Sequence, residues 1–448
     1  MQIHTVATPE LGDRSYVVTT GESALVIDPQ RDLDRIEATL DVAPAYVLET
    51  HVHNDYLTGG LTLATRTGAG YGVNALDEVA FARVPLSHGQ ILSAGSLRVQ
   101  VLATPGHTDT HLAYVVTDDD APEQPAAVFS GGSLLYGTVG RTDLVDPSRA
   151  RALAAEQYRS ALLLGSLDPA TLLFPTHGFG SFCSSTTGSR AELSTVGEQV
   201  EKNVAFLARD ERSFVDSLVA GFGAYPSYYA HMAPLNRLGP GAVALDAPVP
   251  GVAPEALVAR IQAGEVVVDL RDRIAYAASH LAGTLSINLG QQFATYLGWL
   301  APFATPVTLV GASRSELEDA RRQLVRIGFE DVDGIAGPLP ALAPPWHPRR
   351  SYPLGTFAQV AAGLGPDDAV LDVRRDEERA QFAVRDSWHV PLHELPARLG
   401  SLPANRWWVH CVSGFRAGTA ASMLENAGFD VVHIDDHIDR AVELGLTA

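Results

Sequence analysis

The sequence predicts an α/β multidomain protein, and two observations lead to this fold class. In the first half of the chain, several apolar segments typical of buried strands run directly into histidine-bearing loops. In the second half, strands alternate with helical stretches, and this pattern occurs twice, which favours small parallel sheets covered by helices. The chain has 448 residues, enough for about three domains of ordinary size.

The first histidine-bearing loop follows the apolar segment Ala45–Leu48, which is predicted to be a buried strand. Just beyond it, His51, His53 and Asp55 stand two residues apart from one another. Three side chains that can bind a metal, placed just past the end of a strand, indicate a metal site on a rigid sheet edge.

Two later strands end in the same way. The alternating segment Leu97–Leu102 leads to His107 in the sequence Thr-Pro-Gly-His, and Thr171–Phe174 leads to His177 in Pro-Thr-His-Gly. Rigid metal sites are commonly built from ligands that come from distant strands and meet at one sheet edge. The repeated placement at strand ends therefore favours a shared site over several unrelated polar side chains.

The order of these motifs resembles the metallo-β-lactamase fold, and the segment Gly140–Asp143 resembles the persulfide dioxygenase and glyoxalase II-like branch of that fold. The resemblance covers residues 1–240. It implies a four-layer αββα sandwich with a metal site at the edge of the two sheets, and a low-molecular-weight substrate bound near Arg141.

Two positions differ from the pattern of that family. Tyr56 stands where the family has a histidine after the aspartate, and Gly132 stands where it has a metal-bridging or iron-binding aspartate. A dinuclear centre is therefore not expected. If the missing carboxylate alone limits iron chemistry, Gly132→Asp should increase iron binding and oxygen consumption.

The resulting expectation is a mononuclear site for Zn(II) or Fe(II), built from His51, His53 and His107 with Asp55 and His177 nearby. Three neutral imidazoles with one open position suit zinc better than iron. The candidate ligands are His51, His53, Asp55, His107 and His177. His111 is an alternative ligand, and a site that binds no metal is a further alternative.

Composition indicates which binding partners and which cellular location to expect. The formal net charge of −20 argues against nucleic acid as a partner. No apolar run is long enough for a transmembrane helix, and the N-terminus shows no secretory signal, so no membrane is expected. Two cysteines far apart in the sequence form no disulfide framework, which favours a cytoplasmic location. Homo-oligomer formation is left open.

Two segments rich in proline and glycine, 235–252 and 338–353, divide the chain into predicted domains at 1–240, 252–340 and 354–448. The last two share an internal repeat. Their first predicted strands are Glu265–Arg271 and Asp368–Arg374, and their second ones are Val307–Val310 and Trp407–His410. Each therefore predicts a small doubly wound α/β domain.

The last repeat carries a second chemical signal, the loop Cys411-Val-Ser-Gly-Phe-Arg416. A cysteine that follows a strand and opens a helix lies at a positive helix N-terminus, where backbone N–H groups stabilise a thiolate. The loop resembles the active-site loop of rhodaneses. This resemblance implies that Cys411 carries a sulfane sulfur, with Arg416 as a catalytic cation nearby. The first repeat has Gly311–Arg314 and no cysteine, so it resembles an inactive rhodanese domain.

Three further features could belong either to the metal site or to the packed interior of the protein. Cys183 follows His177 by six residues and either faces the metal site or packs in the core. The run Tyr228–Met232 is predicted to be a packed helix that covers the site, with His231 as a residue that could line the pocket.

These observations predict a sulfur-metabolism enzyme. Its metal domain would act on a low-molecular-weight persulfide or thioester, and Cys411 would accept sulfane sulfur from a donor and pass it to a thiol. One alternative is a zinc-dependent thioester hydrolase of the glyoxalase II type, in which a metal activates water. Another alternative is a sulfur-carrier or scaffold protein with a degenerate metal domain.

Overall fold

The computed structural model describes residues 1–185 and 193–448. The chain forms two compact units, Met1–Leu245 with Val325–Gly328, and Asp246–Leu324 with Phe329–Ala448. The predicted domain 354–448 and all of 252–340 except Val325–Gly328 fall within the second unit, which contains two separate parallel sheets.

The first unit contains two six-stranded sheets. In the first sheet, strands β1 to β3 are antiparallel and β3 to β6 are parallel. The strands of this sheet are β1 (Gln2–Thr8), β2 (Asp13–Thr19), β3 (Ala24–Ile27), β4 (Pro44–Leu48), β5 (Gly70–Asn74) and β6 (Val84–Leu86). Those of the second sheet are β7 (Ile91–Ala94), β8 (Leu97–Ala103), β9 (Leu112–Asp118), β10 (Ala127–Gly131), β11 (Leu172–Pro175) and β12 (Ser194–Thr195).

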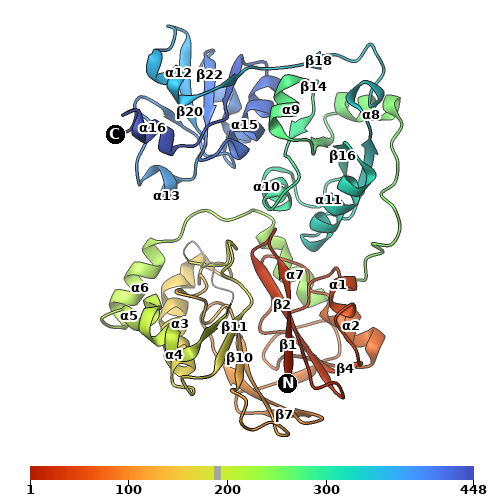
Figure 1. Cartoon of the computed structure of the whole chain (residues 1–448), viewed down its shortest axis with the longest axis vertical. Helices are drawn as coiled ribbons and strands as arrows, with labels where there is room; N and C mark the ends of the chain where they lie inside the picture. Colours follow the sequence, from red (N-terminus) through yellow and green to blue (C-terminus); the bar gives the residue numbers. More distant parts are fainter. Residues whose placement is uncertain (186–192) are drawn as a thin grey trace. The chain divides into compact units, whose positions relative to one another are not determined.

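The two sheets pack face to face around a buried apolar core (Figure 1). Residues of both sheets meet there, such as Tyr16 and Leu25 from the first sheet and Val99 and Phe129 from the second. The alternation of apolar side chains along β8 explains this arrangement, because every second residue faces the core.

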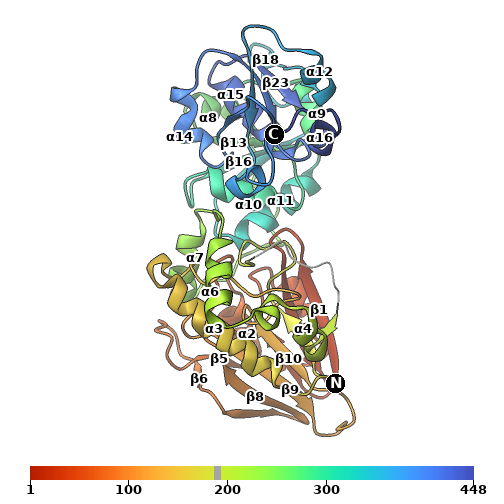
Figure 2. The same cartoon turned by 90° about the vertical axis from the view of Figure 1, so that its left-hand side faces the viewer.

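Helices cover the outer face of each sheet. Apolar residues of α1 (Asp34–Glu37) and α2 (Gly60–Thr67) pack on the outside of the first sheet. Those of α3 and its neighbours pack on the outside of the second sheet (Figures 1 and 2). The remaining helices of this unit are α3 (Ala150–Gly165), α4 (Val196–Lys202), α5 (Val204–Leu207), α6 (Glu211–Ala220) and α7 (Tyr229–Leu238). The four-layer αββα order expected from the sequence is therefore present.

The second unit contains a four-stranded and a five-stranded parallel sheet, in the orders β15-β13-β16-β17 and β19-β23-β22-β20-β21, as the repeat predicts. The strands of the unit are β13 (Val266–Asp269), β14 (His280–Leu281), β15 (Leu285–Ser286), β16 (Val307–Gly311), β17 (Val332–Ala336), β18 (Arg349–Arg350), β19 (Leu354–Gly355), β20 (Asp368–Asp372), β21 (Trp388–His389), β22 (Arg406–His410) and β23 (Val431–Ile434).

Helices separate most of these strands along the chain and pack on the sheets. In the five-stranded sheet, α12 and α16 pack on Val370, Trp408 and Val432, while α15 packs against β22 and β23. The helices are α8 (Pro254–Gln262), α9 (Arg273–Ala278), α10 (Phe293–Leu300), α11 (Arg314–Arg326), α12 (Phe357–Ala362), α13 (Asp376–Arg379), α14 (Leu395–Arg398), α15 (Phe415–Asn426) and α16 (Asp439–Glu443).

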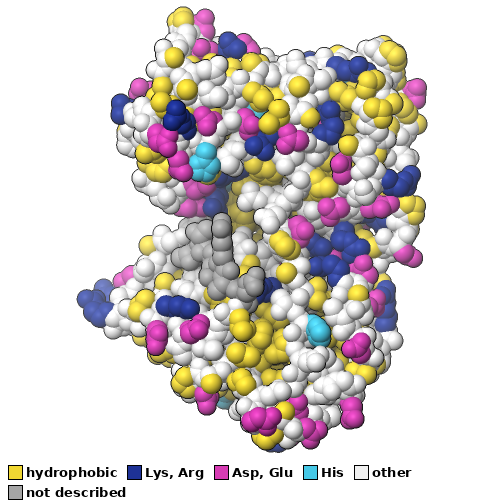
Figure 3. All heavy atoms as spheres, viewed as in Figure 1, with side chains coloured by type: hydrophobic (Ala, Val, Ile, Leu, Met, Phe, Trp, Pro, Cys, Tyr) yellow, Lys and Arg dark blue, Asp and Glu magenta, His cyan; other side chains and the backbone are white. Residues whose placement is uncertain are grey.

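None of the helices in the described ranges is long and apolar enough to cross a membrane. Acidic and basic side chains both occur across the face shown in Figure 3. All five tryptophans of the chain lie between residues 299 and 408, within the second unit.

Candidate metal centre and Cys411 loop

Four histidines from three strand ends meet in the first unit. His51 and His53 follow β4, His107 follows β8 and His177 follows β11. Each side chain is at most 1% exposed. Apart from the His53–His107 pair, the ring centroids lie 4.2–5.8 Å from one another. The structure thus brings together the histidines that the sequence selects as candidate ligands, and Asp55 lies among them.

Three of these rings are held by a hydrogen bond from Nδ1. His51 Nδ1 donates to Thr50 Oγ1 at 2.9 Å, because that hydroxyl itself donates to Asp28. His107 Nδ1 donates to the carbonyl oxygen of Arg141 at 2.7 Å. His177 Nδ1 donates to Asp13 at 2.8 Å. Each bond fixes the ring orientation and turns Nε2 towards the other rings, which is the arrangement that commonly supports metal-binding histidines.

The Nε2 atoms of the same three rings converge. Those of His51 and His177 are 3.3 Å apart, and His107 Nε2 is buried without a hydrogen-bond partner among the described residues. All three ligand atoms lie within 4.8 Å of one another. Two nitrogens that bind one tetrahedral zinc through bonds of about 2.0–2.1 Å lie roughly 3.3 Å apart. The donor set therefore fits a single metal ion.

His53 and Asp55 stand beside this trio with unpartnered atoms of their own. His53 Nε2 faces Glu49 at 3.2 Å and Asp28 at 3.3 Å, so only Nδ1 is free of a described partner. Asp55 Oδ1 is likewise buried without a described partner, while Oδ2 lies 3.3 Å from His177. Both residues can complete the ligand set, His53 through Nδ1 and Asp55 through Oδ1.

Burial governs the protonation of the cluster. Burial and the neighbouring imidazoles lower the pKa of His51, and they lower that of His107 to about 3, so both rings stay neutral. Burial opposes the charging of His177, but Asp55 and Asp13 outweigh it and raise its pKa to about 10, so without a metal the ring holds a proton on Nε2 that a bound ion would displace. Two carboxylates on Nδ1 also make Nε2 a stronger electron donor towards a metal.

Neither Tyr56, which replaces a histidine of the family pattern, nor the alternative ligand His111 is placed to bind a metal. Tyr56 stacks on His53, and its hydroxyl lies 3.0 Å from His53 Nε2, on the side away from the unpartnered Nδ1. His111 uses both ring nitrogens, because Nε2 accepts from the Gly132 N–H while Nδ1 faces Thr104 and Ser133. His111 is therefore a packing residue behind the cluster, which answers the question left open by the sequence.

Arg141 differs from the expectation of a substrate-binding cation. Its guanidinium is 4% exposed and forms a bidentate pair with Asp143 at 2.7 and 2.8 Å. It also donates to the carbonyl oxygen of Gly223 at 2.8 Å and lies over the ring of Tyr225. The side chain thus joins two loops, while its own carbonyl group orients His107.

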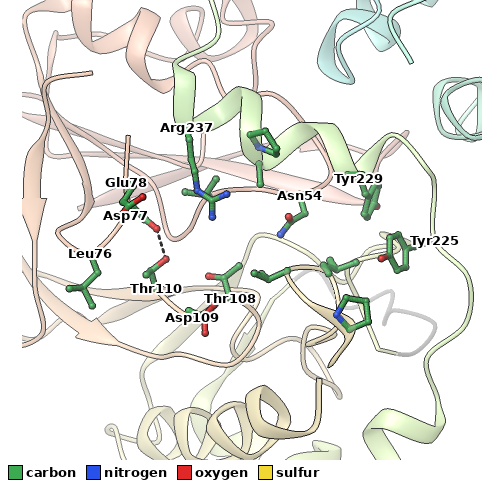
Figure 4. A pocket seen from close by; sticks show the side chains of 17 residues that line it. Asn54, Leu76, Asp77, Glu78, Thr108, Asp109, Thr110, Tyr225, Tyr229 and Arg237 are labelled. Atoms are coloured by element: carbon green, nitrogen blue, oxygen red, sulfur yellow. Dashed lines mark hydrogen bonds between the residues drawn. The ribbon is translucent and has the colours of Figure 1, made fainter. Parts of the chain in front are cut away.

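A cavity of about 650 Å³ lies beside the cluster (Figure 4). Its lining includes chain neighbours of the histidines, namely Val52, Asn54 and Thr108, and residues of helix α7 such as Tyr229 and Arg237. The run 228–232 enters α7, where Tyr228 and Tyr229 are buried, as predicted, while His231 is exposed. The cavity is therefore lined both by chain neighbours of the clustered histidines and by α7.

Cys183 is buried next to Asp55. Burial, reinforced by the charges of Asp55 and Asp13, raises the pKa of the Cys183 thiol well above its usual range. The thiol therefore stays protonated, which fits a packing role better than a nucleophilic one.

In the second unit, Cys411 follows β22 and precedes α15, as predicted. The Gly414 N–H donates to Cys411 Sγ at 3.2 Å. The carbonyl oxygens of this loop face away, because Arg273 donates to Ser413 O at 3.3 Å and His433 Nε2 donates to Gly414 O at 2.9 Å. The loop thus turns an N–H group towards the sulfur.

Arg416 is not a free cation beside the thiol. Its guanidinium forms a bidentate pair with Glu378, and it is 8% exposed. In the first repeat, the Ala312 N–H is already bound by Glu316 at 2.8 Å, and no cysteine is present. The two loops are therefore chemically different despite the repeat.

Sequence reasoning missed the residues that hold the rings, namely Asp13, Asp28 and Thr50. It also missed the part of the cavity lining that lies beyond the run 228–232 in α7, namely Ala233, Pro234 and Arg237. Asp28 directly follows β3, so a search for carboxylates at strand ends would have found it.

No family model matches the chain. A hydroxyacylglutathione hydrolase from Acidiphilium cryptum (strain JF-5) is 32% identical over 176 residues, which cover 38% of this chain and 67% of that protein. A human hydroxyacylglutathione hydrolase-like protein is 38% identical over 132 residues, 29% of this chain and 42% of that protein. The chain thus spans less than half of the length of the human relative.

A solved structure with the same fold is a metallo-β-lactamase from Staphylococcus aureus subsp. aureus COL, with a TM-score of 0.67 and 25% identity. The likeness covers 75% of this chain and 99% of the other. It therefore extends beyond the first unit, which makes up a smaller share of the residues.

Proposed function

The chain belongs, through its first unit, to the family of metallo-hydrolases that includes the hydroxyacylglutathione hydrolases, and we propose that this unit is a zinc-dependent hydrolase of thioesters. The convergence of the Nε2 atoms of His51, His107 and His177 carries this proposal. Their Nδ1 atoms are already bound to acceptors, so the ring orientation is prepared before any ligand arrives.

In this proposal His51, His107 and His177 hold the ion, with His53 Nδ1 and Asp55 Oδ1 within reach. A bound zinc ion supplies Lewis-acid polarisation of a carbonyl group and of water. The protein residues position the reactants. Asp55 Oδ1 is an unpartnered acceptor that can orient a water molecule by accepting its proton in a hydrogen bond. The burial of the rings excludes bulk water from the site.

Iron-dependent persulfide oxidation is the second candidate for this unit, but the site supports it less well. A mononuclear iron site of the two-histidine, one-carboxylate type needs a carboxylate on the same face as its histidines. Gly132 offers none, and the ring of His107 occupies the space where a side chain at position 132 would begin. Neutral imidazoles dominate the remaining donor set, which favours zinc.

Elemental analysis of protein purified without added metal tests the proposal, together with hydrolysis of a thioester. We expect about one zinc per chain and zinc-dependent thioester cleavage. His107→Ala should lose most of the metal, because it removes one ligand of a small set, whereas His4→Ala, at an exposed histidine of β1, should keep it. Iron together with oxygen uptake would favour the persulfide oxidation. A protein without metal or hydrolysis would be a binding module instead.

For the second unit we propose sulfur transfer through Cys411. The observation in its favour is the N–H of Gly414 aimed at the sulfur at the start of α15, which stabilises a thiolate. The thiolate attacks the outer sulfur of a persulfide R–S–SH, the S–S bond breaks and R–S⁻ leaves, so that Cys411 carries the sulfane sulfur. A second thiolate then attacks that sulfur, takes it away as a new persulfide and releases the Cys411 thiolate.

Mass spectrometry after treatment with a persulfide donor tests this transfer. One added sulfur should map to the peptide with Cys411. Cys411→Ser should abolish both the mass increase and the transfer activity, because a serine hydroxyl stays protonated at neutral pH. Cys183→Ser should leave both unchanged, since that thiol is buried in the other unit. Sulfur found on Cys183 instead would contradict the assignment.

A further inference from the structure

Three residues that line the cavity beside the histidine cluster each carry a buried polar atom that lacks a hydrogen-bond partner among the described residues. The atoms are Asn54 Nδ2, Thr108 Oγ1 and Asp77 Oδ2. Each of the three residues is at most 5% exposed. Buried polar atoms normally have partners, so three orphans in one cavity indicate a ligand that supplies them.

These atoms need different partners from the ligand. The Asn54 amide is a donor and needs an acceptor, while the Asp77 carboxylate is an acceptor and needs a donor. The Thr108 hydroxyl can act as either. Asp77 Oδ1 already accepts from Thr110, so its orientation in the cavity is fixed (Figure 4). Hydroxyl and amide groups carry both donors and acceptors, so a ligand with several of them can supply partners of each kind.

The charges of the lining do not suit an anionic ligand. The only cation among the described lining residues is Arg237, whereas Asp77, Glu78 and Asp109 bring three carboxylates. Arg149 binds Asp109 from outside the lining, which neutralises that carboxylate. Arg237 lies close enough to Asp77 to stabilise its charge. The cavity therefore retains no excess of positive charge for phosphate or carboxylate groups.

We propose that the thiol carrier of the substrate is uncharged and rich in hydroxyl and amide groups. This inference rests on the proposed thioester hydrolysis and specifies its substrate class. The carrier occupies the cavity between Asn54, Thr108 and Asp77, with the rings of Tyr225 and Tyr229 as apolar walls. Because Asn54 and Thr108 directly follow His53 and His107 in the chain, a carrier bound there brings its sulfur end towards the cluster.

Acetyl thioesters that differ in the charge of the carrier test the proposal. S-acetyl-N-acetylcysteine amide and S-acetyl-N-acetylcysteine have nearly the same size, but only the second carries a carboxylate. We expect at least tenfold higher kcat/KM for the uncharged amide, and hydrolysis of the hydroxyl-rich S-acetyl-1-thioglucose. Acetyl-CoA and S-acetylglutathione should be poor substrates. A preference for either of these anionic esters over the uncharged ones would overturn the inference.

Binding is measured separately, so that the substrate class and the reaction are distinguished. Calorimetric titration with the S-methyl derivatives of the same thiols requires no hydrolysis. If uncharged carriers bind but no ester is cleaved, the inference holds and the proposed hydrolysis fails. If only anionic carriers bind, or none of the thiols binds, the inference fails whatever the hydrolytic activity is.

Two variants of the lining sharpen the test. Asp77→Asn replaces an acceptor by a donor, and should weaken hydrolysis of the uncharged esters about tenfold. Asp119→Asn, at an exposed loop residue, is the matched control and should have no effect. Glu78→Lys adds a cation at an exposed lining position and should raise kcat/KM for acetyl-CoA several-fold. If Glu78→Lys leaves acetyl-CoA as poor as before, charge does not select the carrier.

Discussion

The orientation of each histidine in the cluster depends on the hydrogen-bond partner of the ring nitrogen that points away from the cluster. His51, His107 and His177 present Nε2 to a common point because a hydroxyl, a carbonyl oxygen and a carboxylate hold their Nδ1 atoms. His111 carries the same ring, but both of its nitrogens are already bound, so it offers no lone pair. Whether a histidine can bind a metal is therefore decided by its hydrogen-bond partners.

Gly132→Asp illustrates the same dependence on neighbours. A Cβ atom at position 132 would lie 2.3 Å from a carbon of the His107 ring, so the ring would have to move. We therefore expect this variant to bind less zinc and to lose stability by ~1–3 kcal/mol, the usual cost of overpacking. The simpler expectation from the sequence, a gain of iron, ignores this contact.

Elemental analysis and thermal unfolding measure both effects. Gly180→Asp provides a control for the change of residue type in the same unit, since no heavy atom lies within 4 Å of an added Cβ there. Its backbone φ of +104° adds a strain of its own, so the comparison rests on metal content. A zinc content equal to that of the wild type in Gly132→Asp would show that the ring can move without loss of the site.

At the scale of elements, the β22–α15 junction depends on a single glycine. Gly414 adopts a φ of +93° and caps α15, and a Cβ there would lie 2.3 Å from Asp435 and 3.0 Å from Arg273. Arg273 begins α9 in the cysteine-free repeat and pairs with Asp435 at 2.7 Å. The first repeat thus contributes a side chain that shapes the Cys411 loop, which gives it a structural role without a cysteine of its own.

Substitutions of Gly414 and of Gly428 distinguish the effect of backbone strain from that of a steric clash. Gly414→Ala should slow the alkylation of Cys411 by iodoacetamide several-fold, because the Arg273–Asp435 pair must shift and the N–H leaves the sulfur. Gly428→Ala has nearly the same φ, +90°, but meets no atom within 4 Å. It should lower the melting temperature less than Gly414→Ala does, through backbone strain alone, and leave alkylation unchanged. Equal alkylation rates in the two variants would refute the role of the contact.

At the scale of the whole molecule, buried titratable groups make the second unit sensitive to acid. Burial lowers the pKa values of His410 and His433 to about 4. Burial would raise the pKa values of Asp372 and Glu378, but ion pairs and hydrogen bonds, with His410 and Arg374 for Asp372 and with Arg416 for Glu378, lower both to about 2. All four groups therefore hold fewer protons in the folded chain than in the unfolded chain at mildly acidic pH.

The sign of the pH effect follows from this difference. As the pH falls from about 6.5 to 4, the unfolded chain binds protons at the two histidines that the folded chain rejects, so the free energy of unfolding decreases. Below about pH 4.5, protonation of Asp372 and Glu378 in the unfolded chain decreases the free energy of unfolding further. The decrease from the histidines should be of the order of 3 kcal/mol each at most.

Denaturant titrations at pH 7.5, 5.5 and 4.5, followed by tryptophan fluorescence, measure this effect. All five tryptophans lie in the second unit, so the signal reports its unfolding alone. His410→Gln should flatten the pH dependence, whereas His437→Gln, at an exposed histidine, should not. A free energy of unfolding that is constant from pH 7.5 to 4.5 would contradict the assignment.

The sequence predicts the strands and the gathering of the histidines at one sheet edge, because apolar runs and strand ends are local patterns. It selects His51, His53 and His107 as the ligands and places His177 only nearby, whereas the ring nitrogens that converge in the structure belong to His51, His107 and His177. β4, β8, β11, β13, β16, β20 and β22 lie where the sequence predicts them. The partners of the functional groups were not predictable, because they depend on long-range packing. Asp13 reaches His177, and Glu378 neutralises Arg416, across large distances in the chain. For the same reason the sequence did not predict that Arg141 pairs with Asp143 instead of standing free for a substrate.

The near-complete enclosure of the histidine rings has a kinetic consequence. An ion held by side chains with at most 1% exposure leaves only when the surrounding loops open. Its release to a chelator should then proceed at the frequency of that opening, and raising the chelator concentration should bring the rate to a plateau instead of a proportional increase. The protein would thus retain its metal in dilute solution for longer than its equilibrium affinity alone implies, and incorporation during folding would be the faster route of entry.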